Sequence, residues 1–326
     1  MAYHPRIESK EYAGFTTTRC KNSELWFINN KKLEEKVLAF TAKYSEMCNV
    51  KIYALAIAGS HLHFLAEFPD ENCSDFKRNL NSIIARIASE CCIEFNQRKF
   101  WERRYSKELV PLDPEDLEEY FFYIVLQSVQ DGLVEKISDY PVYNCFHDAI
   151  SGNKREFKLV NWTAYNRANR GKKKVKIKDY TETYTLKFSK LPGNEHLNHK
   201  EYKKKMLAKL EEKRQAIVKE RKKEGKGFLG RKKILGTKPG SRAKNPKKSS
   251  RYSHRPRVLS KCPERRQTGN AYYFSKQDHF KKASKKYREG NLTVEFPCGM
   301  YRPHLPYPIR NKINKQNSPP PEMVNL

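Results

Sequence analysis

Residues 51–68 read KIYALAIAGSHLHFLAEF. Lys51–Ala58 and His61–Phe68 are each rich in strand-forming residues, and Gly59-Ser60 between them has turn-forming composition. Side chains alternate between the two faces of a strand, so one face of the second strand is apolar and suited to helix packing. That face holds Leu62, Phe64, Ala66 and Phe68. The other face holds His61, His63, Leu65 and Glu67, so the stretch predicts a hairpin that displays a histidine pair.

The segments around this hairpin predict further strands and helices. Residues 14–19 and 101–110 have strand composition, and 31–47 have the apolar spacing of an amphipathic helix. A second helix is expected over 74–95 with Ser74 as its cap, and a third from Asp113-Pro114 to about Val129. The resulting order is β-α-β-β-α-β-α. This order favours an α+β fold in which helices pack on an antiparallel sheet.

Basic residues are unevenly distributed. The 326 residues include 66 Lys and Arg against 37 Asp and Glu, a formal net charge of +29. Residues 1–150 hold 18 of the basic and 23 of the acidic residues, and 151–326 hold the other 48 and 14. We therefore expect a globular domain over 1–152, which the motifs below make the catalytic one, and a basic extension over 153–326. The excess charge of the extension indicates a polyanionic partner, and nucleic acid is the default.

The extension has weaker structural signals than the first domain. Short strands are expected over 159–165 and 180–188, a solvated helix over 200–224, and disorder around 225–261. Two basic runs are the candidate nucleic-acid contacts: Lys172, Lys173, Lys174 and Lys176, then Arg231, Lys232 and Lys233. Aromatic residues alternate with lysines near the end of the chain: Tyr272, Tyr273, Phe274, Phe280 and Tyr287. They suit base stacking on a single strand or the core of a small module, and both interpretations stay open.

The sequence favours a cytoplasmic location. No stretch approaches the ~20 apolar residues of a membrane span, and the N-terminus lacks the basic-then-apolar layout of a signal peptide. The eight cysteines form no C-x-x-C pair, so neither a zinc ribbon nor a secreted disulfide framework is expected. We expect reduced thiols in a cytoplasmic, nucleoid-associated bacterial protein without membrane contact.

A carboxamide and a tyrosine accompany the histidine pair. Two histidines two apart on one strand face can converge on a metal ion, although a bare pair is more often incidental. Tyr123 and Gln127 lie four apart on one face of the third helix. The Gln127 carbonyl oxygen suits a hard cation such as Mg²⁺ or Mn²⁺. Tyr123 could then attack a metal-polarised phosphodiester, or it could belong to the core with its apolar neighbours.

Three motifs resemble one family. Residues 54–65 (ALAIAGSHLHFL), 100–105 (FWERRY) and 123–134 (YIVLQSVQDGLV), continued by Asp139-Tyr140-Pro141, occur in the order and spacing of the REP-associated tyrosine transposases. These belong to the single-tyrosine HUH endonuclease and transposase superfamily. The resemblance covers about residues 10–150. Gly59-Ser60 stands where the family has Pro-Asn, and Ser128 where it has Pro after the carboxamide.

The resemblance implies an HUH nuclease fold, that is, a ferredoxin-like antiparallel sheet with helices packed on it. It implies cleavage and rejoining of single-stranded DNA near hairpins through a covalent 5′-phosphotyrosine, with a divalent metal. By position, His61, His63 and Gln127 would be metal ligands and Tyr123 the nucleophile. A homodimer that shares active sites stays open.

Several alternatives remain at this stage. Tyr120, Tyr140 and Tyr143 compete with Tyr123 for the nucleophile. Glu67, Arg103 and Arg104 are accessory candidates, and at most one of the two arginines is expected to face the site as a phosphate contact. A rolling-circle replication initiator or relaxase would share the site, although no G-x-x-x-x-G-K-[ST] run accompanies it. A catalytically silent DNA- or RNA-binding protein is the non-enzymatic alternative.

Overall fold

A four-stranded antiparallel sheet forms the centre of the molecule. The computed structural model describes residues 6–92, 99–170, 175–242 and 256–305. The strands are β1 (Tyr12–Arg19), β2 (Lys51–Ile57), β3 (His61–Glu67) and β4 (Ser106–Pro111), in the order β2-β3-β1-β4. Helix α1 (Lys31–Met47) follows β1, and α2 (Cys73–Cys91) follows β3. This β-α-β-β-α-β order is the ferredoxin-like arrangement, so the expected fold class is confirmed.

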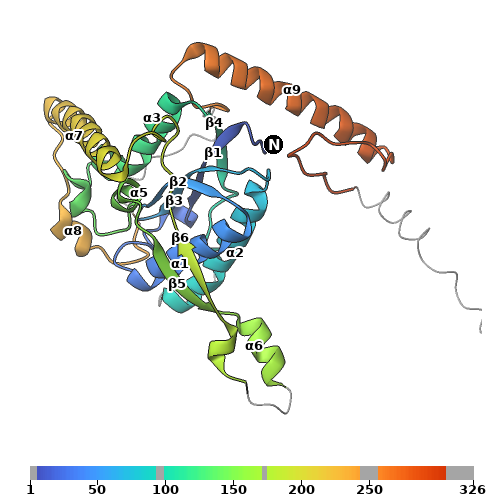
Figure 1. Cartoon of the computed structure of the whole chain (residues 1–326), viewed down its shortest axis with the longest axis horizontal. Coiled ribbons are helices and arrows are strands. Elements are labelled where there is room, and N and C mark those ends of the chain that lie inside the picture. The colour runs from blue at the N-terminus through green and yellow to red at the C-terminus, as the bar shows by residue number, and fades with distance from the viewer. Residues whose placement is uncertain (1–5, 93–98, 171–174, 243–255, 306–326) are drawn as a thin grey trace, which may run out of the picture.

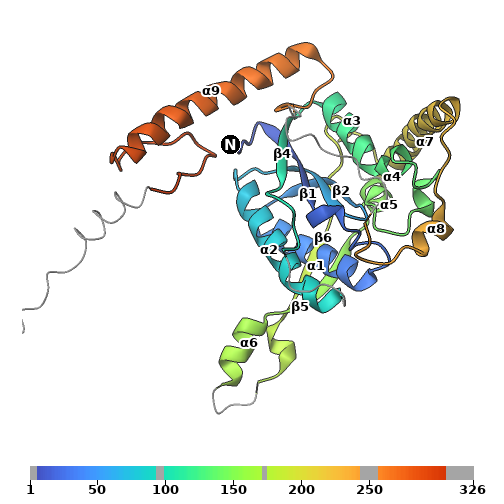
Figure 2. The ribbon, with the colours of Figure 1, turned by 180° about the vertical axis from the view of Figure 1, so that it is seen from behind.

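The two faces of the sheet carry different elements. On the α2 side, the rings of Phe64 and Phe68 lie 5.7 and 5.9 Å from Phe76. The opposite side meets α3 (Pro114–Val125), which contacts β2, β3 and β4 (Figures 1 and 2). The alternation expected for residues 61–68 is therefore confirmed, because the apolar set faces α2 and the histidines face the other way.

Two element boundaries differ from expectation. Helix α2 begins at Cys73 after Asn72, so Ser74 lies in its first turn and is not its cap. The backbone N–H of Ser74 instead donates to the buried carboxylate of Glu8 at 2.6 Å. Strand β4 begins at Ser106, and residues 102–104 form bends after an isolated bridge between Cys20 and Trp101. The expected alternation of Arg103 and Arg104 along a strand is therefore wrong.

The third helix divides where the candidate site begins. Asp113 caps α3 by accepting from the Glu115 N–H at 3.0 Å, with Pro114 in the first turn as expected. The helix ends at Val125, and the short α4 (Gln127–Gln130) follows Leu126, whose φ of −91° and ψ of 2° interrupt the helical path. The 3-10 helices Lys21–Ser23 and Ile137–Asp139 and helix α5 (Phe146–Ser151) complete this part of the fold.

The extension begins with a hairpin that crosses α1. Strands β5 (Arg155–Val160) and β6 (Thr181–Leu186) pair antiparallel, and both contact α1. Between them lie α6 (Trp162–Asn169) and the 3-10 helix Ile177–Tyr180. The strand expected over 159–165 is wrong beyond Val160, because the Asn161 side chain accepts from the Ala164 N–H at 3.1 Å and starts a helix. The strand expected over 180–188 is confirmed by β6.

The described part of the extension continues with the helices α7 (His199–Lys223), α8 (Arg231–Leu235) and α9 (Pro263–Arg288). Buried apolar residues of the extension, such as Leu186, Tyr202, Met206 and Ile234, belong to the same core as the sheet. The expectation of disorder is wrong for residues 225–242, because α8 and its flanks are held against the domain. The Asn29 amide donates to the carbonyls of Ile234, Leu235 and Thr237 at 3.2, 2.7 and 2.8 Å. Residues 243–255 lie outside the described part.

None of the helices in the described ranges is long and apolar enough to cross a membrane.

Candidate active site

The two histidines lie side by side on the sheet face opposite α2. His61 and His63 open β3, and their ring centroids are 4.6 Å apart with nearly perpendicular planes. His63 Nδ1 lies 2.9 Å from the hydroxyl of Thr17 on β1, and His61 Nδ1 lies 3.2 Å from the hydroxyl of Ser60. Hydrogen bonds at Nδ1 fix the orientation of an imidazole, which is the usual outer support of a metal-binding histidine. Ser60, where the family has Asn, thus still supports a ligand candidate.

Gln127 approaches the histidine pair from the start of α4. Its Nε2 lies 2.8 Å from His61 Nε2, although the two residues are 66 positions apart in sequence. Gln127 Oε1 is buried and has no hydrogen-bond partner among the described residues. Half a turn of the amide exchanges its nitrogen and oxygen, and would present this oxygen where the nitrogen now lies. An unpartnered carbonyl oxygen beside an imidazole nitrogen fits a divalent-metal site.

The donor set is mixed. No group of three or more His, Cys, Asp and Glu side chains suited to a metal ion occurs within the described ranges. A carboxamide lies outside those four residue types, so the arrangement of His61, His63 and Gln127 is the candidate that remains.

His61 is held in its neutral form. Burial, reinforced by the neighbouring Arg19 guanidinium, lowers the pKa of His61 from 6.5 to about 4, against the opposing influence of Asp131 and the Gln127 contact. Only the neutral imidazole has a lone pair for a metal ion. The environment therefore keeps His61 ready to bind a cation at neutral pH.

Tyr123 is exposed near the histidines. Its side chain is 43% exposed, whereas Phe121, Phe122, Ile124 and Val125 around it in sequence are buried, so core packing is not its role. The Tyr123 ring lies 5.8 Å from the ring of Phe15 on β1, and Phe15 lies 5.6 Å from His63. Tyr123 and His63 thus pack against the same ring.

The competing tyrosines are less accessible. Tyr120 is half-buried and lies 6.0 Å from Phe15, and burial raises the pKa of its phenol. Tyr140 and Tyr143 are buried, which also raises the pKa of each. The Tyr143 hydroxyl donates to Asp148 at 2.9 Å. Among these four tyrosines, Tyr123 is the one that combines exposure with proximity to the histidine pair.

The accessory candidates are one residue on β3 and two in the bend before β4. Glu67 accepts from the Tyr53 hydroxyl at 2.6 Å and pairs with Lys51 at 3.2 Å. It is four residues beyond His63, or roughly 13 Å along the strand. Arg103 and Arg104 are exposed in the bend before β4, and Arg104 is electrostatically coupled to Arg6. The spacing along β3 thus separates Glu67 from the histidines, whereas Arg103 and Arg104 stay candidates for a phosphate contact.

The candidate nucleic-acid contacts fall in two places. Lys172, Lys173 and Lys174 lie outside the described residues, and Lys176 is exposed between α6 and β6. Arg231, Lys232 and Lys233 lie on the exposed side of α8. Arg231 donates to the Asp139 carbonyl at 3.2 Å, so one member of this run is engaged within the protein.

Several site neighbours are missed by sequence reasoning. Thr17 and Arg19 face the histidines because β1 pairs with β3 in the register Thr17↔His63 and Arg19↔His61. Thr17 and Arg19 are two apart in FTTTR, which indicates that they share one face of β1. Only the pairing with β3 shows that this is the face of the histidines. Asp131 contributes to the electrostatics of His61 from the end of α4. The sequence signal for Asp131 is its spacing of four residues from Gln127, which suggests that both lie near the histidines.

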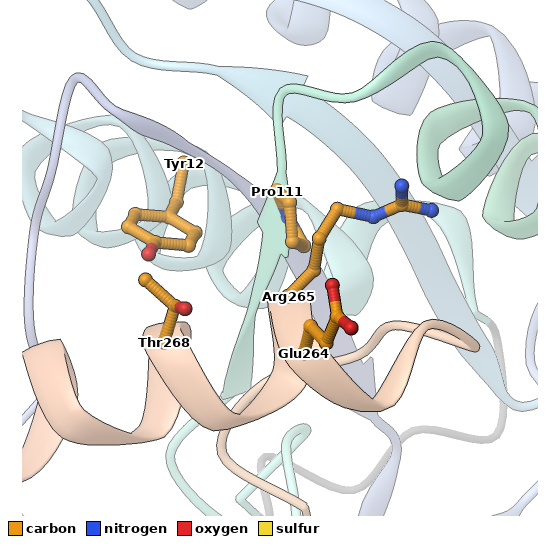
Figure 3. Close-up of a pocket in the computed structure, with 5 residues that line it drawn as sticks. All are labelled: Tyr12, Pro111, Glu264, Arg265 and Thr268. Carbon is orange, nitrogen blue, oxygen red and sulfur yellow. The ribbon is translucent and has the colours of Figure 1, made fainter.

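A separate surface hollow does not belong to this site. It has a volume of about 290 Å³ and lies where α9 meets the edge of the sheet (Figure 3). Its lining is Tyr12, Pro111, Glu264, Arg265 and Thr268. The Arg265 guanidinium turns away from Tyr12 and pairs with Asp113, Glu115 and Asp116 at the start of α3. The hollow thus accompanies the docking of α9 and contains no candidate catalytic group.

Comparison with known proteins finds similarity to transposases. Residues 17–122 match the family model described as "Transposase IS200 like". The match ends one residue before Tyr123, so the tyrosine and Gln127 lie beyond it.

Two individual proteins are also similar to the chain. A Haemophilus influenzae protein named as a REP-associated tyrosine transposase is 28% identical over 127 residues, covering 35% of this chain and 71% of the relative. A solved structure of a REP-associated tyrosine transposase bound to a REP hairpin aligns with a TM-score of 0.39 at 19% identity. That alignment covers 45% of this chain and 84% of the other. The family model and the named relative confirm the resemblance to transposases predicted from the motifs.

Proposed function

We propose that this protein cleaves and rejoins single-stranded DNA next to hairpins, with Tyr123 as the nucleophile and a divalent metal bound by His61, His63 and Gln127. The observation that carries the proposal is the contact between Gln127 Nε2 and His61 Nε2 at 2.8 Å, with a buried unpartnered amide oxygen beside it. An exposed tyrosine on the preceding helix completes the set of groups that such chemistry needs.

The metal, Mg²⁺ or Mn²⁺, would be bound through imidazole nitrogens of His61 and His63 and the Gln127 carbonyl oxygen. When bound, it would polarise the phosphodiester and offset the negative charge that develops on the phosphate. Arg19 adds a positive charge from the neighbouring strand, where its influence on His61 supports a position close to the bound phosphate.

Tyr123 carries the covalent step. Its phenolic oxygen attacks the phosphorus and forms a new P–O bond, and its proton passes to solvent. The bond from phosphorus to the 3′ oxygen breaks, and that oxygen takes up a proton as a free 3′ hydroxyl. The DNA then has a 5′ phosphate esterified to Tyr123. Attack by a 3′ hydroxyl reverses these changes and rejoins the strand without an external energy source.

The basic extension holds the helix that carries Tyr123. Lys209 and Lys213 of α7 pair with Glu118 and Glu119 of α3 at 2.6 and 2.9 Å. At the N-terminal end of α3, Arg265 pairs with the buried Asp116 at 2.8 Å. These contacts support a second role for the extension, which positions the nucleophile in addition to supplying the positive charge that binds DNA.

The proposal is tested by cleavage of labelled hairpin oligonucleotides with single-stranded flanks, in Mn²⁺ and in a chelator. We expect Tyr123→Phe to abolish cleavage and the matched variant Tyr120→Phe to retain it. Loss of cleavage in the chelator, and in His61→Ala, is expected as well. Equal cleavage by wild type and Tyr123→Phe would refute the assignment of the nucleophile.

A further inference from the structure

The hairpin β5–β6 ends in a tip that projects from the molecule. Both strands lie against α1 in the body of the protein, whereas α6 extends beyond it in both views (Figures 1 and 2). The described part of the tip consists of residues 161–170 and 175–180. No residue of α6 or of the 3-10 helix Ile177–Tyr180 is buried. The tip therefore contributes nothing to the core, and any role it has depends on its exposed surface.

Three aromatic rings order this tip. Trp162 lies 5.8 Å from Tyr165, and Tyr165 lies 5.8 Å from Tyr180, both edge to face. The Asn161 N–H donates to the Tyr180 carbonyl at 2.8 Å, which closes the two ends of the tip. Edge-to-face pairs hold rings in fixed orientations. The indole of Trp162 is therefore held on a small supported base.

Trp162 is the exposed tryptophan of this protein. Its side chain is 56% exposed, whereas Trp26 and Trp101 are 6% and 8% exposed. The edge-to-face contact with Tyr165 leaves more than half of Trp162 open to a partner. A flat, accessible indole suits a partner that is itself planar and aromatic.

The charge around Trp162 identifies that partner. Arg167, Arg170, Lys176 and Lys178 are exposed on the described part of the tip, and Asp179 is its one acidic residue. A cationic surface with one exposed ring matches a polymer that alternates anionic phosphates with stackable bases. Because the bases of a duplex are already stacked on each other, an unpaired strand is the form that can use the indole.

We propose that the tip is a binding site for single-stranded DNA, in which a base stacks on Trp162 and the surrounding basic residues contact the phosphates. The site is separate from the histidine pair, which lies on the sheet face opposite α2. It rests on the proposed function only in taking single-stranded DNA as the ligand. Its task would be to hold an unpaired flank of the substrate while the hairpin occupies the rest of the protein.

The position of the two other tryptophans provides a direct assay. Both are buried, so quenching of intrinsic fluorescence by a short oligothymidylate reports mainly on Trp162. We expect wild-type full-length protein to be quenched by oligothymidylate in chelator, where cleavage does not occur. Binding measured by anisotropy of labelled oligothymidylate should weaken roughly fivefold or more in Trp162→Ala. Trp162→Phe should keep most of the affinity and lose the quenching, which guards against a folding defect in the alanine variant.

A matched variant and two alternative ligands decide the outcome. Tyr301→Ala removes another exposed aromatic side chain, outside the tip, and should leave the affinity unchanged. Replacing Arg167 and Arg170 by Gln should lower the slope of log affinity against log salt by roughly 1.4. Unchanged affinity in Trp162→Ala, an equal loss in Tyr301→Ala, or equal quenching by a blunt duplex would overturn the proposal. Quenching by anionic vesicles in place of DNA would do so too. None of these results depends on whether Tyr123 cleaves DNA.

Discussion

Replacing Lys77 by methionine should stabilise the protein and change how its stability depends on pH. Lys77 lies on α2 with its side chain fully buried against the sheet. Its Nζ lies 4.4 Å from the centroid of the Phe64 ring and has no hydrogen-bond partner among the described residues. Burial lowers the pKa of Lys77 from 10.5 to about 7, with Arg6 acting in the same direction and Cys73 opposing it.

The size of the effect follows from linkage. Between pH 7 and pH 10.5 the unfolded chain keeps a proton on Lys77 that the folded chain has lost. The unfolded state binds more protons in that window, so the free energy of unfolding rises with pH. Lys77 thus costs about 4 kcal/mol at pH 7, about 2 kcal/mol near pH 9, and almost nothing above pH 11. Lys77→Met also removes the cation–π contact with Phe64, which lowers the expected gain in the free energy of unfolding by about 1 kcal/mol.

Urea denaturation, followed through the buried Trp26 and Trp101, measures the difference between variant and wild type. We expect Lys77→Met to be more stable by about 3 kcal/mol at pH 7, with the advantage shrinking by about 2 kcal/mol at pH 9. The exposed Lys281 gives a matched control, since Lys281→Met should show no pH-dependent difference. A Lys77→Met protein that is less stable than wild type, with the same difference at both pH values, would refute the reasoning.

Two further predictions concern the site and the extension. Gln127→Ala should weaken Mn²⁺ binding at least about tenfold by titration calorimetry, because it removes an oxygen ligand, whereas Glu67→Gln should have no effect. Equal affinity in wild type and Gln127→Ala would remove the carboxamide from the site. Asn29 has a φ of +52°, a backbone conformation that aspartate also tolerates. Asn29→Asp therefore keeps the side-chain shape but removes the amide that donates to three carbonyls near α8. Urea denaturation should show a loss of about 1 kcal/mol, and an unchanged midpoint would contradict this role.

The sheet could be predicted because its strands have a one-sided pattern. The alternation in residues 61–68 assigns each side chain to a face without any knowledge of the fold. Helix α1 matches the expected range of residues 31–47, since its apolar spacing is regular. Boundaries set by tertiary contacts were not accessible. Serine is a common helix cap, so Ser74 was expected to cap α2. Its N–H instead donates to Glu8, a residue distant in sequence, and no local pattern indicates this contact.

The candidate site was only partly accessible from sequence. Their spacing places His61 and His63 on one strand face, but the motif that contains Tyr123 and Gln127 is what indicates a site. Thr17 and Arg19 depend on strand pairing, which a single strand's pattern does not give.

The extension was the least predictable part. Its charge density resembles that of disordered segments, yet a few buried residues such as Tyr202 and Ile234 attach it to the domain core. Sparse apolar residues in a basic sequence give almost no periodic signal. Their effect appears only once the surface that receives them is known.

The central claim is that Tyr123 becomes covalently linked to DNA. The direct measurement is mass spectrometry of peptides from the wild-type protein after reaction with a hairpin oligonucleotide and Mn²⁺. The account predicts a nucleotide phosphate attached to the peptide that contains Tyr123, at the tyrosine itself, and no adduct in chelator. An adduct on Tyr120, Tyr140 or Tyr143, or cleaved DNA without any protein adduct, would contradict it.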